Sequence, residues 1–371
     1  MARIKVLSVI GTRPEAIKMI PVIKALEEDP EIESIFVNTA QHREQLDQVL
    51  DLFQIKPKYD FNIMKNKSNL VETVSTILIE LTAVLENEKP DIVLVHGDTA
   101  TTLAGAQASF FSQIPVGHVE AGLRTYERYS PFPEEMNRQV TGRLASLHFA
   151  ATETNKTNLL SESINEDDIF VIGNTVIDAL LDISKKSLEI HSDVKKIIDS
   201  PLKTILLTTH RRENLEDLNH IYEAINHLVD EHKDIQIVFP VHKNPSVRDK
   251  VRQSLKESSR IHLLEPIDYY SFAKLMKHSY FIITDSGGIQ EEAPLFKRPI
   301  LVARTSTERV EGLKAGTLKL VGTDKLKIIE ESSRLLIDPT YYESFSRNKN
   351  PYGDGTSSKK IVEIIKQRFS D

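Results

Sequence analysis

The chain has 371 residues, of which 40% are hydrophobic and 27% charged, and its formal net charge at pH 7 is −7. This length suits two domains of about 150–200 residues, and the negative charge argues against nucleic acid or an anionic membrane as a partner. The absence of cysteine excludes disulfides, thiolate nucleophiles and cysteine-based metal sites. The apolar run 4–10 is too short to cross a bilayer and lacks the plan of a signal peptide, so we expect a cytoplasmic protein.

Apolar runs of strand length alternate with helical patterns in the first half of the chain. The predicted strands are 4–10, 34–39, 91–98, 114–122, 147–152 and 169–175. The segments between them carry apolar residues at helical spacing, as in the helix that follows the first strand. Since buried strands joined by helices are typical of parallel sheets, we predict a parallel sheet covered by helices on both faces.

The same alternation starts again after residues 180–203, a segment rich in Lys, Asp and Ser that we interpret as a junction. Strands are predicted at 204–210, 235–242, 261–266, 280–288 and 299–303. We therefore predict an α/β fold of two Rossmann-like domains whose parallel sheets face each other across a cleft. The predicted domain limits are 1–175 and 176–352, and a closing helical segment, 353–371, could pack back on the first domain.

The first predicted strand runs directly into a helix at "GTRPEAIK", where no glycine-rich phosphate loop occurs. Thr12 and Glu15 have the spacing of a capping box. The free N–H groups and the dipole of this helix attract an anion, and Arg13 adds a permanently charged planar donor suited to phosphate. We predict that Arg13 binds phosphate, whereas Lys18 could equally be a solvated helix charge.

Acidic residues and histidines follow the next predicted strands. The motifs are "VHGDTATT" with His96 and Asp98, "GHVEAGLRT" with His118 and Glu120, and "SPFPEEMNR" with Glu134, Glu135 and Arg138. Each acidic residue could instead cap a helix or face its dipole. Because neighbouring parallel strands end at one edge, carboxylates placed there would shift each other's pKa and could divide acid and base roles. A metal site at His96, Asp98 and Glu120 is an alternative that no helical H-x-x-x-H pattern supports.

A third cluster of polar residues lies in the second half. "THRREN" ends a strand at His210, and "PVHKNP" ends the next at His242. "TDSGGIQEEA" places Ser286 and two glycines before a helix, where main-chain N–H groups can approach a phosphate. Glu292, one turn later, could accept hydrogen bonds from ribose hydroxyls. Both features are also compatible with an ordinary tight turn and a helix dipole partner.

Taken together, these motifs resemble the non-hydrolysing UDP-N-acetylglucosamine 2-epimerases, which interconvert UDP-GlcNAc and UDP-ManNAc. The matching stretches are "GTRPEAIKM", "QHREQLDQVL", "HGDT", "GHVEAGLRT", "SPFPEEMNR", "GNTVIDALL", "HRREN", "PVHKNP", "DSGGIQEEAP" and "TERVEG". They follow the family's order over residues 11–312. The resemblance implies a fold like that of GT-B glycosyltransferases, a nucleotide held mostly by the second domain, a homodimer, and no cofactor or metal.

The resemblance also implies roles for individual residues. The catalytic residues would be Asp98, Glu120, Glu134 and His210. The UDP-sugar would be bound by Arg13, Lys18, Arg138, His210, Phe272, Ser286, Gly287, Gly288, Glu292 and Arg309. A second, allosteric UDP-GlcNAc site would involve Gln41, His42, Arg212 and His242. Val310 departs from the family, which usually has proline after "TER".

The chemistry of the substrate indicates a mechanism. The C2 proton is a poor acid unless the anomeric bond to UDP breaks, so we expect elimination of UDP to a glycal and re-addition on the other face. Cations would stabilise the departing diphosphate, and carboxylates would move the proton, with the acid and the base left unassigned. The product would supply ManNAc for cell-envelope polysaccharide. A GT-B glycosyltransferase, a hydrolysing 2-epimerase and a non-catalytic nucleotide-sugar sensor are the alternatives.

Overall fold

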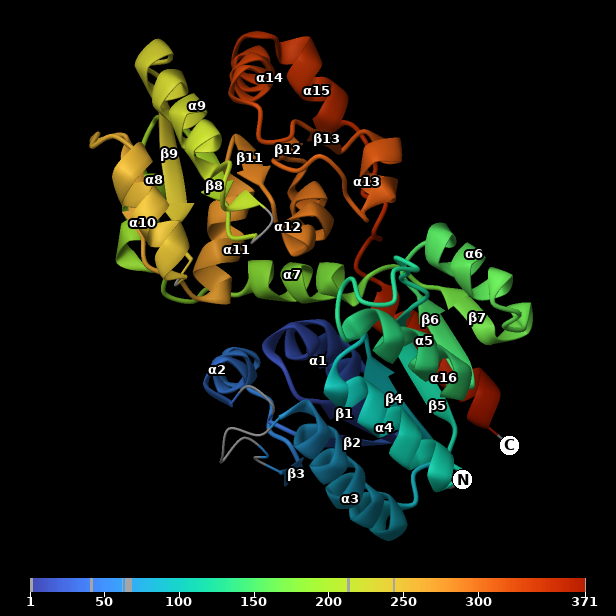
Figure 1. Ribbon diagram of the computed structural model, residues 1–371. Helices are drawn as coiled ribbons and strands as arrows, with labels where there is room; N and C mark the ends of the chain where they lie inside the picture. Colours follow the sequence, from blue (N-terminus) through green and yellow to red (C-terminus); the bar gives the residue numbers. More distant parts are fainter. Residues whose placement is uncertain are drawn as a thin grey trace. The chain divides into compact units, whose positions relative to one another are not determined.

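The computed structural model describes residues 3–40, 43–61, 63, 69–211, 214–242 and 244–370. The chain forms two compact units. Unit 1 comprises Met1–Leu181 with Tyr352–Asp371, and unit 2 comprises Asp182–Pro351. Each unit is built around its own parallel sheet, and Figure 1 shows helices packed on both faces of each sheet. The α/β fold with two parallel sheets predicted from the sequence is confirmed.

The sheet of unit 1 has the strand order β3-β2-β1-β4-β5-β6-β7, with all neighbours parallel. Its strands are β1 (Ile4–Ile10), β2 (Ile32–Asn38), β3 (Tyr59–Asp60), β4 (Ile92–His96), β5 (Val116–Ala121), β6 (Leu147–Ala150) and β7 (Ile169–Val171). The helices are α1 (Arg13–Glu28), α2 (Arg43–Phe53), α3 (Leu70–Glu88), α4 (Ala100–Phe111), α5 (Glu134–Leu144), α6 (Glu153–Ser161), α7 (Thr175–Lys185) and α16 (Ser357–Phe369). Helix α7 begins in unit 1 and ends in unit 2.

The sheet of unit 2 has the strand order β10-β9-β8-β11-β12-β13, again parallel throughout. Its strands are β8 (Lys203–Thr208), β9 (Ile235–Pro240), β10 (Ile261–Leu264), β11 (Phe281–Thr284), β12 (Ile300–Val302) and β13 (Leu318–Leu320). The helices are α8 (Ser192–Ile198), α9 (Leu218–Glu231), α10 (Pro245–Ser254), α11 (Tyr269–His278), α12 (Gly287–Glu292), α13 (Val310–Ala315), α14 (Lys325–Ile337) and α15 (Pro339–Ser346).

Both sheets reverse their strand order at one point, between β1 and β4 in unit 1 and between β8 and β11 in unit 2. The chain leaves these strands toward opposite sides of the sheet, which opens a crevice at their carboxyl ends where ligands bind in doubly wound folds. The four strands at the two reversal points lead directly to Arg13, Asp98, His210 and Ser286. The predicted polar clusters therefore lie where this fold class binds ligands.

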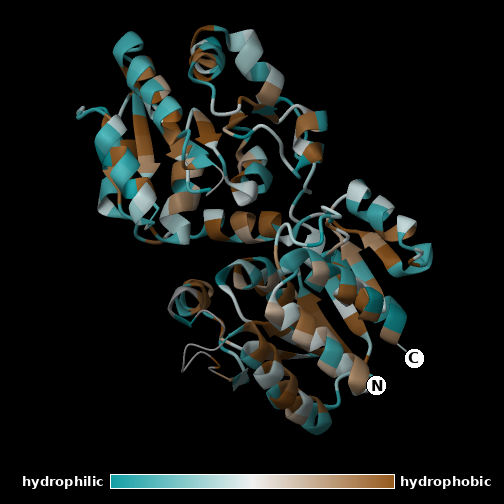
Figure 2. Ribbon diagram, in the orientation of Figure 1, coloured by the Kyte–Doolittle hydropathy of each residue, from teal (hydrophilic) through white to brown (hydrophobic). Residues whose placement is uncertain are grey.

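The strands form because their side chains are buried on both faces of each sheet. In unit 1, Leu7 and Val9 of β1 pack with Leu81 of α3 and Ala106 of α4. In unit 2, the core combines β8, β9 and β11 with helices α9 and α14. Figure 2 shows the hydrophobic residues concentrated in the strands and polar residues on the outer faces of the helices. This burial supplies the main stabilisation of each unit.

The end of the chain returns to unit 1, where α16 packs against α1. The carboxylate of Asp178 in α7 accepts hydrogen bonds from the main-chain N–H groups of Ser357, at 3.3 Å, and Ser358, at 2.9 Å. Lys366 pairs with Asp29 at 3.1 Å, beyond the end of α1. A carboxylate at the start of α16 and a cation in its last turn both suit the helix dipole.

The sequence prediction missed two strands, β3 and β13, which have two and three residues. Both lie at edges of their sheets, where one hydrogen-bonded neighbour is enough to extend the chain. Runs this short carry no periodicity that separates a strand from a loop. Among the helices of the described residues, none combines the length and the apolarity needed to cross a membrane.

Candidate active site

Asp98 lies in the turn between β4 and α4 and is held from two sides. The preceding residue, Gly97, has a left-handed backbone with φ +67, which lets the chain turn sharply after the strand. The main-chain carbonyl of Asp98 accepts a hydrogen bond from the Asn137 side chain at 2.9 Å. Its carboxylate Oδ2 lies 2.8 Å from a terminal nitrogen of Arg138. The contacts from α5 thus fix both the backbone and the side chain of Asp98.

The carboxyl group of Asp98 has an environment suited to proton transfer. Burial raises the pKa of Asp98 to about 6, and the nearby charges of Glu120 and Glu134 add to this effect, whereas Arg138 opposes it. A carboxyl with this pKa exchanges protons near neutral pH, as general acids and bases require. The electrostatic influence of Glu120 and Glu134 on Asp98 also shows that the structure brings the three predicted carboxylates together.

Glu120, the second-last residue of strand β5, has an unusual conformation. Its φ is +62, in the left-handed region, and the pairing with β6 shifts register between Val119 and Ala121. Such a bulge re-aims a side chain at the end of a strand. The Glu120 carboxylate forms an ion pair with Lys18 of α1, which places Lys18 inside the acidic cluster.

His96, the last residue of β4, lies beside this ion pair. Its Nε2 atom is 3.7 Å from Glu120 Oε2, and the ring is buried. Burial lowers the pKa of His96 to about 4, with Glu120 opposing and Lys18 reinforcing the shift, so the ring is neutral at physiological pH. No group of three or more His, Cys, Asp or Glu side chains arranged to hold a metal occurs in the described part of the chain.

A buried carboxylate joins the turn that carries Arg13 to the turn that carries Asp98. Glu15 Oε2 accepts from the main-chain N–H groups of Gly11, at 3.1 Å, and Thr12, at 2.8 Å. Its other oxygen accepts from the Thr99 hydroxyl at 2.7 Å and the Thr102 hydroxyl at 3.3 Å. The half of the predicted capping box in which Glu15 accepts from the Thr12 N–H is present, and the structure adds a link between two strand ends that the sequence pattern did not indicate.

The two glutamates at the start of α5 differ in role. Glu135 points inward, where it accepts from the main-chain N–H groups of Thr125 and Tyr126, each at 3.0 Å, and lies 3.5 Å from Arg138. Burial would raise the pKa of Glu135, but these bonds and Gln139 lower it instead. Glu134 is partly exposed beside Asp98. Glu134 is therefore the residue of the pair that a ligand can reach.

Arg13 is partly exposed at the first position of α1. Within residues 3–370 as far as the structure describes them, its side chain forms no hydrogen bond or ion pair. A guanidinium left without a protein partner at the start of a helix is suited to an anionic ligand.

In unit 2, His210 follows β8 and contacts a buried carboxylate. Asp285 accepts from the main-chain N–H groups of His210, at 3.0 Å, and Arg211, at 2.9 Å, and its Oδ1 lies 3.3 Å from His210 Nδ1. The ring of His210 stacks on His242 with centroids 5.5 Å apart. Burial lowers the pKa of His210, with Asp285 opposing and His242 and Arg211 adding to the shift.

Ser286 and Gly287 begin α12 under the guanidinium of Arg309. A Cβ atom on Gly287 would lie 3.0 Å from Arg309 Cζ, so a larger residue would press on the guanidinium. Arg309 donates to Glu291 at 3.0 Å and also pairs with Glu308. The structure therefore groups a cation, a glycine and a short helix at the carboxyl end of β11.

Glu308 connects Arg309 to further arginines. It lies 2.8 Å from Arg304 and 3.4 Å from Arg211. Burial would raise the pKa of Glu308, but Arg309 and Arg304 outweigh burial and lower it to about 2. The loop after β12 thus carries a permanently ionised carboxylate that orders the cations around it.

The remaining predicted residues are distributed as follows. Gly288 follows Gly287, and Glu292 Oε1 would lie 3.6 Å from a Cβ placed on Gly288. Phe272 is partly buried in α11. Of the proposed allosteric set, His242 is described above, whereas Gln41, His42 and Arg212 lie outside the described residues.

Sequence reasoning missed two residues that organise the site. Asp285 orders the turn with His210, and Glu291 holds Arg309. Asp285 is entirely buried. The sequence feature that could have identified it is its position before Ser286 in "TDSGG", because a carboxylate at the end of a buried strand needs hydrogen-bond donors nearby.

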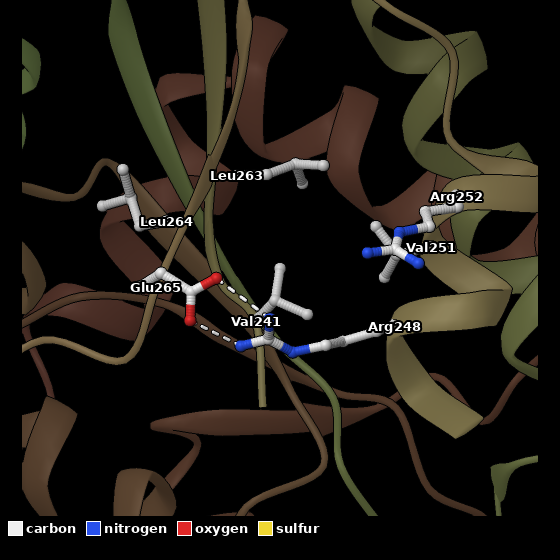
Figure 3. Close-up of a pocket in the computed structure, with 7 residues that line it drawn as sticks. All are labelled: Val241, Arg248, Val251, Arg252, Leu263, Leu264 and Glu265. Atoms are coloured by element: carbon white, nitrogen blue, oxygen red, sulfur yellow. Dashed lines mark hydrogen bonds and ion pairs between the residues drawn. The ribbon is translucent and has the colours of Figure 1, made fainter. Parts of the chain in front are cut away.

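Unit 2 also contains a pocket of about 140 Å³ beside β9, β10 and α10 (Figure 3). Its lining residues are Val241, Arg248, Val251, Arg252, Leu263, Leu264 and Glu265. Arg248 spans one side and donates to Glu265 at 3.0 Å. This pocket has no predicted site residue in its lining and lies away from the reversal point between β8 and β11.

Comparison with known proteins agrees with this geometry. A family model described as UDP-N-acetylglucosamine 2-epimerase matches residues 24–366. The UDP-N-acetylglucosamine 2-epimerase of Bacillus subtilis is 52% identical over 98% of this chain and 96% of its own length. The enzyme of that name from Escherichia coli K12 is 52% identical over 98% of both chains.

A solved structure gives the same answer at the level of the fold. The crystal structure of UDP-GlcNAc 2-epimerase from Neisseria meningitidis bound to UDP-GlcNAc matches with a TM-score of 0.88 and 50% identity. The match covers 98% of this chain and all of that one. These similarities extend over nearly the whole sequence, and the chain belongs to the UDP-N-acetylglucosamine 2-epimerase family.

Proposed function

We propose that this protein reversibly converts UDP-GlcNAc to UDP-ManNAc by eliminating UDP and adding it back. The observation that supports this most directly is the grouping of Asp98, Glu120 and Glu134 at one sheet edge in a chain of this family. A glycosyltransferase needs one base and an acceptor site, whereas inversion at C2 needs a group on each face of the sugar.

The proposed reaction is balanced without a redox cofactor. A carboxylate takes the proton from C2, the C1–O bond breaks, and the electron pair of the C2–H bond forms the C1=C2 double bond of a glycal. UDP leaves with the electrons of the broken C–O bond. In the second half, a phosphate oxygen of UDP attacks C1 while a proton is delivered to the opposite face of C2.

The departing diphosphate gains negative charge and requires fixed cations. In our proposal Arg13 and Arg309 provide them, and His210, whose pKa is lowered by burial, donates a hydrogen bond together with the N–H groups at Ser286–Gly288. Arg309 is held by Glu291 and Glu308, so it needs no reorganisation during the reaction. Glu292 would accept hydrogen bonds from the ribose, and Phe272 would contact the nucleotide.

Two of the carboxylates differ in a way that suits divided roles. Asp98, with a pKa raised to about 6 by burial, can carry a proton near neutral pH. Glu120, paired with the Lys18 ammonium, is stabilised as the ion. We propose that these two exchange protons with the sugar and that Glu134 assists, with neither face of the sugar assigned to a particular residue.

One experiment tests the function. Purified protein is incubated with UDP-GlcNAc alone in deuterated water and followed by NMR, and we expect UDP-ManNAc at equilibrium with deuterium at C2 in both sugars. Free ManNAc with stoichiometric UDP would indicate a hydrolysing enzyme instead. Binding of UDP-GlcNAc without turnover, unaffected by Asp98→Asn, Glu120→Gln and Glu134→Gln, would indicate a nucleotide-sugar sensor.

We further propose that the protein is a cytoplasmic homodimer. Large apolar side chains are exposed on the neighbouring helices α3 and α4, among them Val71, Ile79, Phe110 and Phe111. Exposed apolar side chains can contribute to a protein–protein interface. Light scattering during gel filtration should give twice the mass of the chain, and a monomer would refute the dimer.

An allosteric UDP-GlcNAc site that includes His242 is a separate proposal. If it operates, epimerisation of UDP-ManNAc should show a lag that a trace of UDP-GlcNAc abolishes. Simple saturation without a lag would contradict it.

A further inference from the structure

The backbone of Glu120 does not by itself determine where its carboxylate points. Its φ of +62 is uncommon for a residue with a side chain, and the register shift beside it interrupts the ladder to β6. A strained residue at a functional site keeps its conformation only when its surroundings hold it. The orientation of this carboxylate therefore depends on the groups that bind it.

Asn174, in the loop between β7 and α7, is one of these groups. Its Nδ2 donates to Glu120 Oε2 at 3.3 Å. Its Oδ1 accepts from the main-chain N–H of Val176 at 3.0 Å. Because a main-chain N–H can only donate, the amide oxygen must face Val176 and the NH₂ group must face Glu120. Asn174 is 4% exposed, so water does not compete freely for these bonds.

Asn174 is itself held firmly within unit 1. Its main-chain N–H donates to the carbonyl of Tyr352 at 2.7 Å, at the point where the chain returns to this unit. The preceding Gly173 has φ +94, and a Cβ atom there would lie 3.2 Å from the same carbonyl and 3.3 Å from Gly353 Cα. The loop is thus packed against the returning segment at a distance that only glycine allows.

We propose that Asn174 is a positioning residue that holds the Glu120 carboxylate in its reactive orientation and favours its ionised form. Lys18 binds the same oxygen, but an ammonium on a flexible chain supplies charge with little directional restraint. The amide of Asn174 is rigidly anchored and restrains direction. This inference rests on the proposed epimerisation, in which Glu120 exchanges a proton with the sugar.

The variant Asn174→Asp replaces the donor with an oxygen and adds a negative charge beside Glu120. Aspartate keeps an oxygen for the Val176 N–H, and the main-chain bond to Tyr352 is unaffected. We expect kcat for UDP-GlcNAc to fall about 10-fold or more, with KM within about twofold. The acid limb of the kcat profile should move about half to one pH unit higher, because protonation of Glu120 becomes easier. Asn174→Ala, which adds no charge, should lower kcat in the same way.

The other charged or titratable groups that face Glu120 are unchanged in both variants. They are Lys18 of α1, His96 of β4 and Asp98 of the next turn. A matched control is Asn226→Asp in unit 2, where Nδ2 donates to the Ser254 carbonyl at 2.7 Å and Oδ1 accepts from the Lys256 N–H at 3.1 Å. The control removes an equivalent donor far in the sequence from the site, and its kinetics should match the wild type.

Three kinetic results would overturn the proposal. The first is an unchanged kcat and pH profile in Asn174→Asp, and the second is an equal loss of kcat in Asn174→Asp and Asn226→Asp. The third is a raised KM with an unchanged kcat in Asn174→Asp. A crystal structure of Asn174→Asp without substrate tests the contact independently of activity. We expect the Glu120 carboxylate to rotate away, and an unmoved carboxylate refutes the proposal. If the wild type fails to form UDP-ManNAc, the proposed function fails, while the crystal structure still decides whether Asn174 positions Glu120.

Discussion

Arg138 of α5 lies 2.8 Å from the carboxylate of Asp98, which follows β4, and it is also 3.5 Å from Glu135. A buried guanidinium between two carboxylates would be expected to keep both ionised. Instead, burial and the neighbouring Glu120 and Glu134 outweigh Arg138 at Asp98, whose pKa is raised to about 6. Crowded carboxylates thus leave Asp98 able to carry a proton, even though a cation touches it.

The raised pKa of Asp98 makes the stability of the protein depend on pH. The folded state binds the Asp98 proton more tightly than the unfolded chain does. The contribution of this proton to the free energy of unfolding is therefore fully present below about pH 3.8 and is lost as the pH rises through about 6. Relative to Asp98→Asn, the wild type should lose up to about 3 kcal/mol of unfolding free energy between pH 4 and 7. Urea unfolding of both proteins across this range measures the trend.

The exposed Asp249 provides a control for this measurement, because its carboxylate lies largely in solvent. Asp249→Asn should show no comparable trend against the wild type. If the difference in unfolding free energy between Asp98→Asn and the wild type does not change with pH, Asp98 titrates alike in the folded and unfolded chain. Its assignment as a proton carrier near neutral pH would then be wrong.

Glu15 should be important for both stability and turnover. In Glu15→Gln an NH₂ group replaces one carboxylate oxygen, so either the N–H groups of Gly11 and Thr12 or the hydroxyls of Thr99 and Thr102 lose their acceptor. We expect a loss of about 1–3 kcal/mol in unfolding free energy and a fall in kcat. Glu72→Gln is the control: Glu72 also belongs to a capping box, with Asn69, but is exposed. The loss of unfolding free energy in Glu72→Gln should stay within about 0.5 kcal/mol. Equal losses in Glu72→Gln and Glu15→Gln would exclude the bridging role of Glu15.

The sequence predicted the long buried strands well, because near-continuous apolar runs of strand length are typical of parallel sheets that are covered on both faces. It also indicated that polar residues lie at the carboxyl ends of the strands in each unit. Asp98 follows β4, and Glu120 is the second-last residue of the adjacent strand β5; parallel strands carry the residues at their carboxyl ends to one edge of the sheet. The same rule accounts for the pairing of His210 with Asp285, since β8 and β11 are neighbours, but the sequence analysis did not predict this pairing.

The sequence could not predict the groups that hold these residues in place. Glu15 has the local pattern of a capping residue, and nothing near it in the chain indicates that Thr99 would share its carboxylate. Asn174 and Glu120 are 54 positions apart, and their contact depends on how β5 and β7 are spaced in the sheet. Interactions between distant segments depend on packing, which periodicity does not record.

Gly287 should be required for binding UDP rather than for folding. In Gly287→Ala the methyl group would lie 3.0 Å from Arg309 Cζ and displace the guanidinium from Glu291. If Arg309 binds the diphosphate, loss of a charge-assisted hydrogen bond weakens binding of UDP about 10-fold or more, as titration calorimetry would measure. At Gly288 the added methyl meets Glu292 only at 3.6 Å, so Gly288→Ala should cost less. Unchanged affinity in Gly287→Ala would remove Arg309 from the proposed diphosphate site.

Gly173 links backbone geometry to catalysis through its neighbour Asn174. An alanine at Gly173 would have to adopt φ +94, and its methyl group would lie 2.9 Å from Ser357 Oγ and 3.2 Å from the Tyr352 carbonyl. Gly322→Ala is a matched control, because Gly322 has φ +65 and its nearest added contact is 3.9 Å away. Both variants bear the cost of an alanine at positive φ, about 1 kcal/mol at Gly322. The φ of Gly173 lies beyond the left-handed helical region, so the excess loss in Gly173→Ala reports crowding together with this added backbone strain. We expect that excess to be at least about 1 kcal/mol by urea unfolding.

Because displacement of the loop carries Asn174 away from Glu120, kcat should fall in Gly173→Ala and not in Gly322→Ala. Equal kcat values in the two variants would show that the loop does not control the position of Glu120.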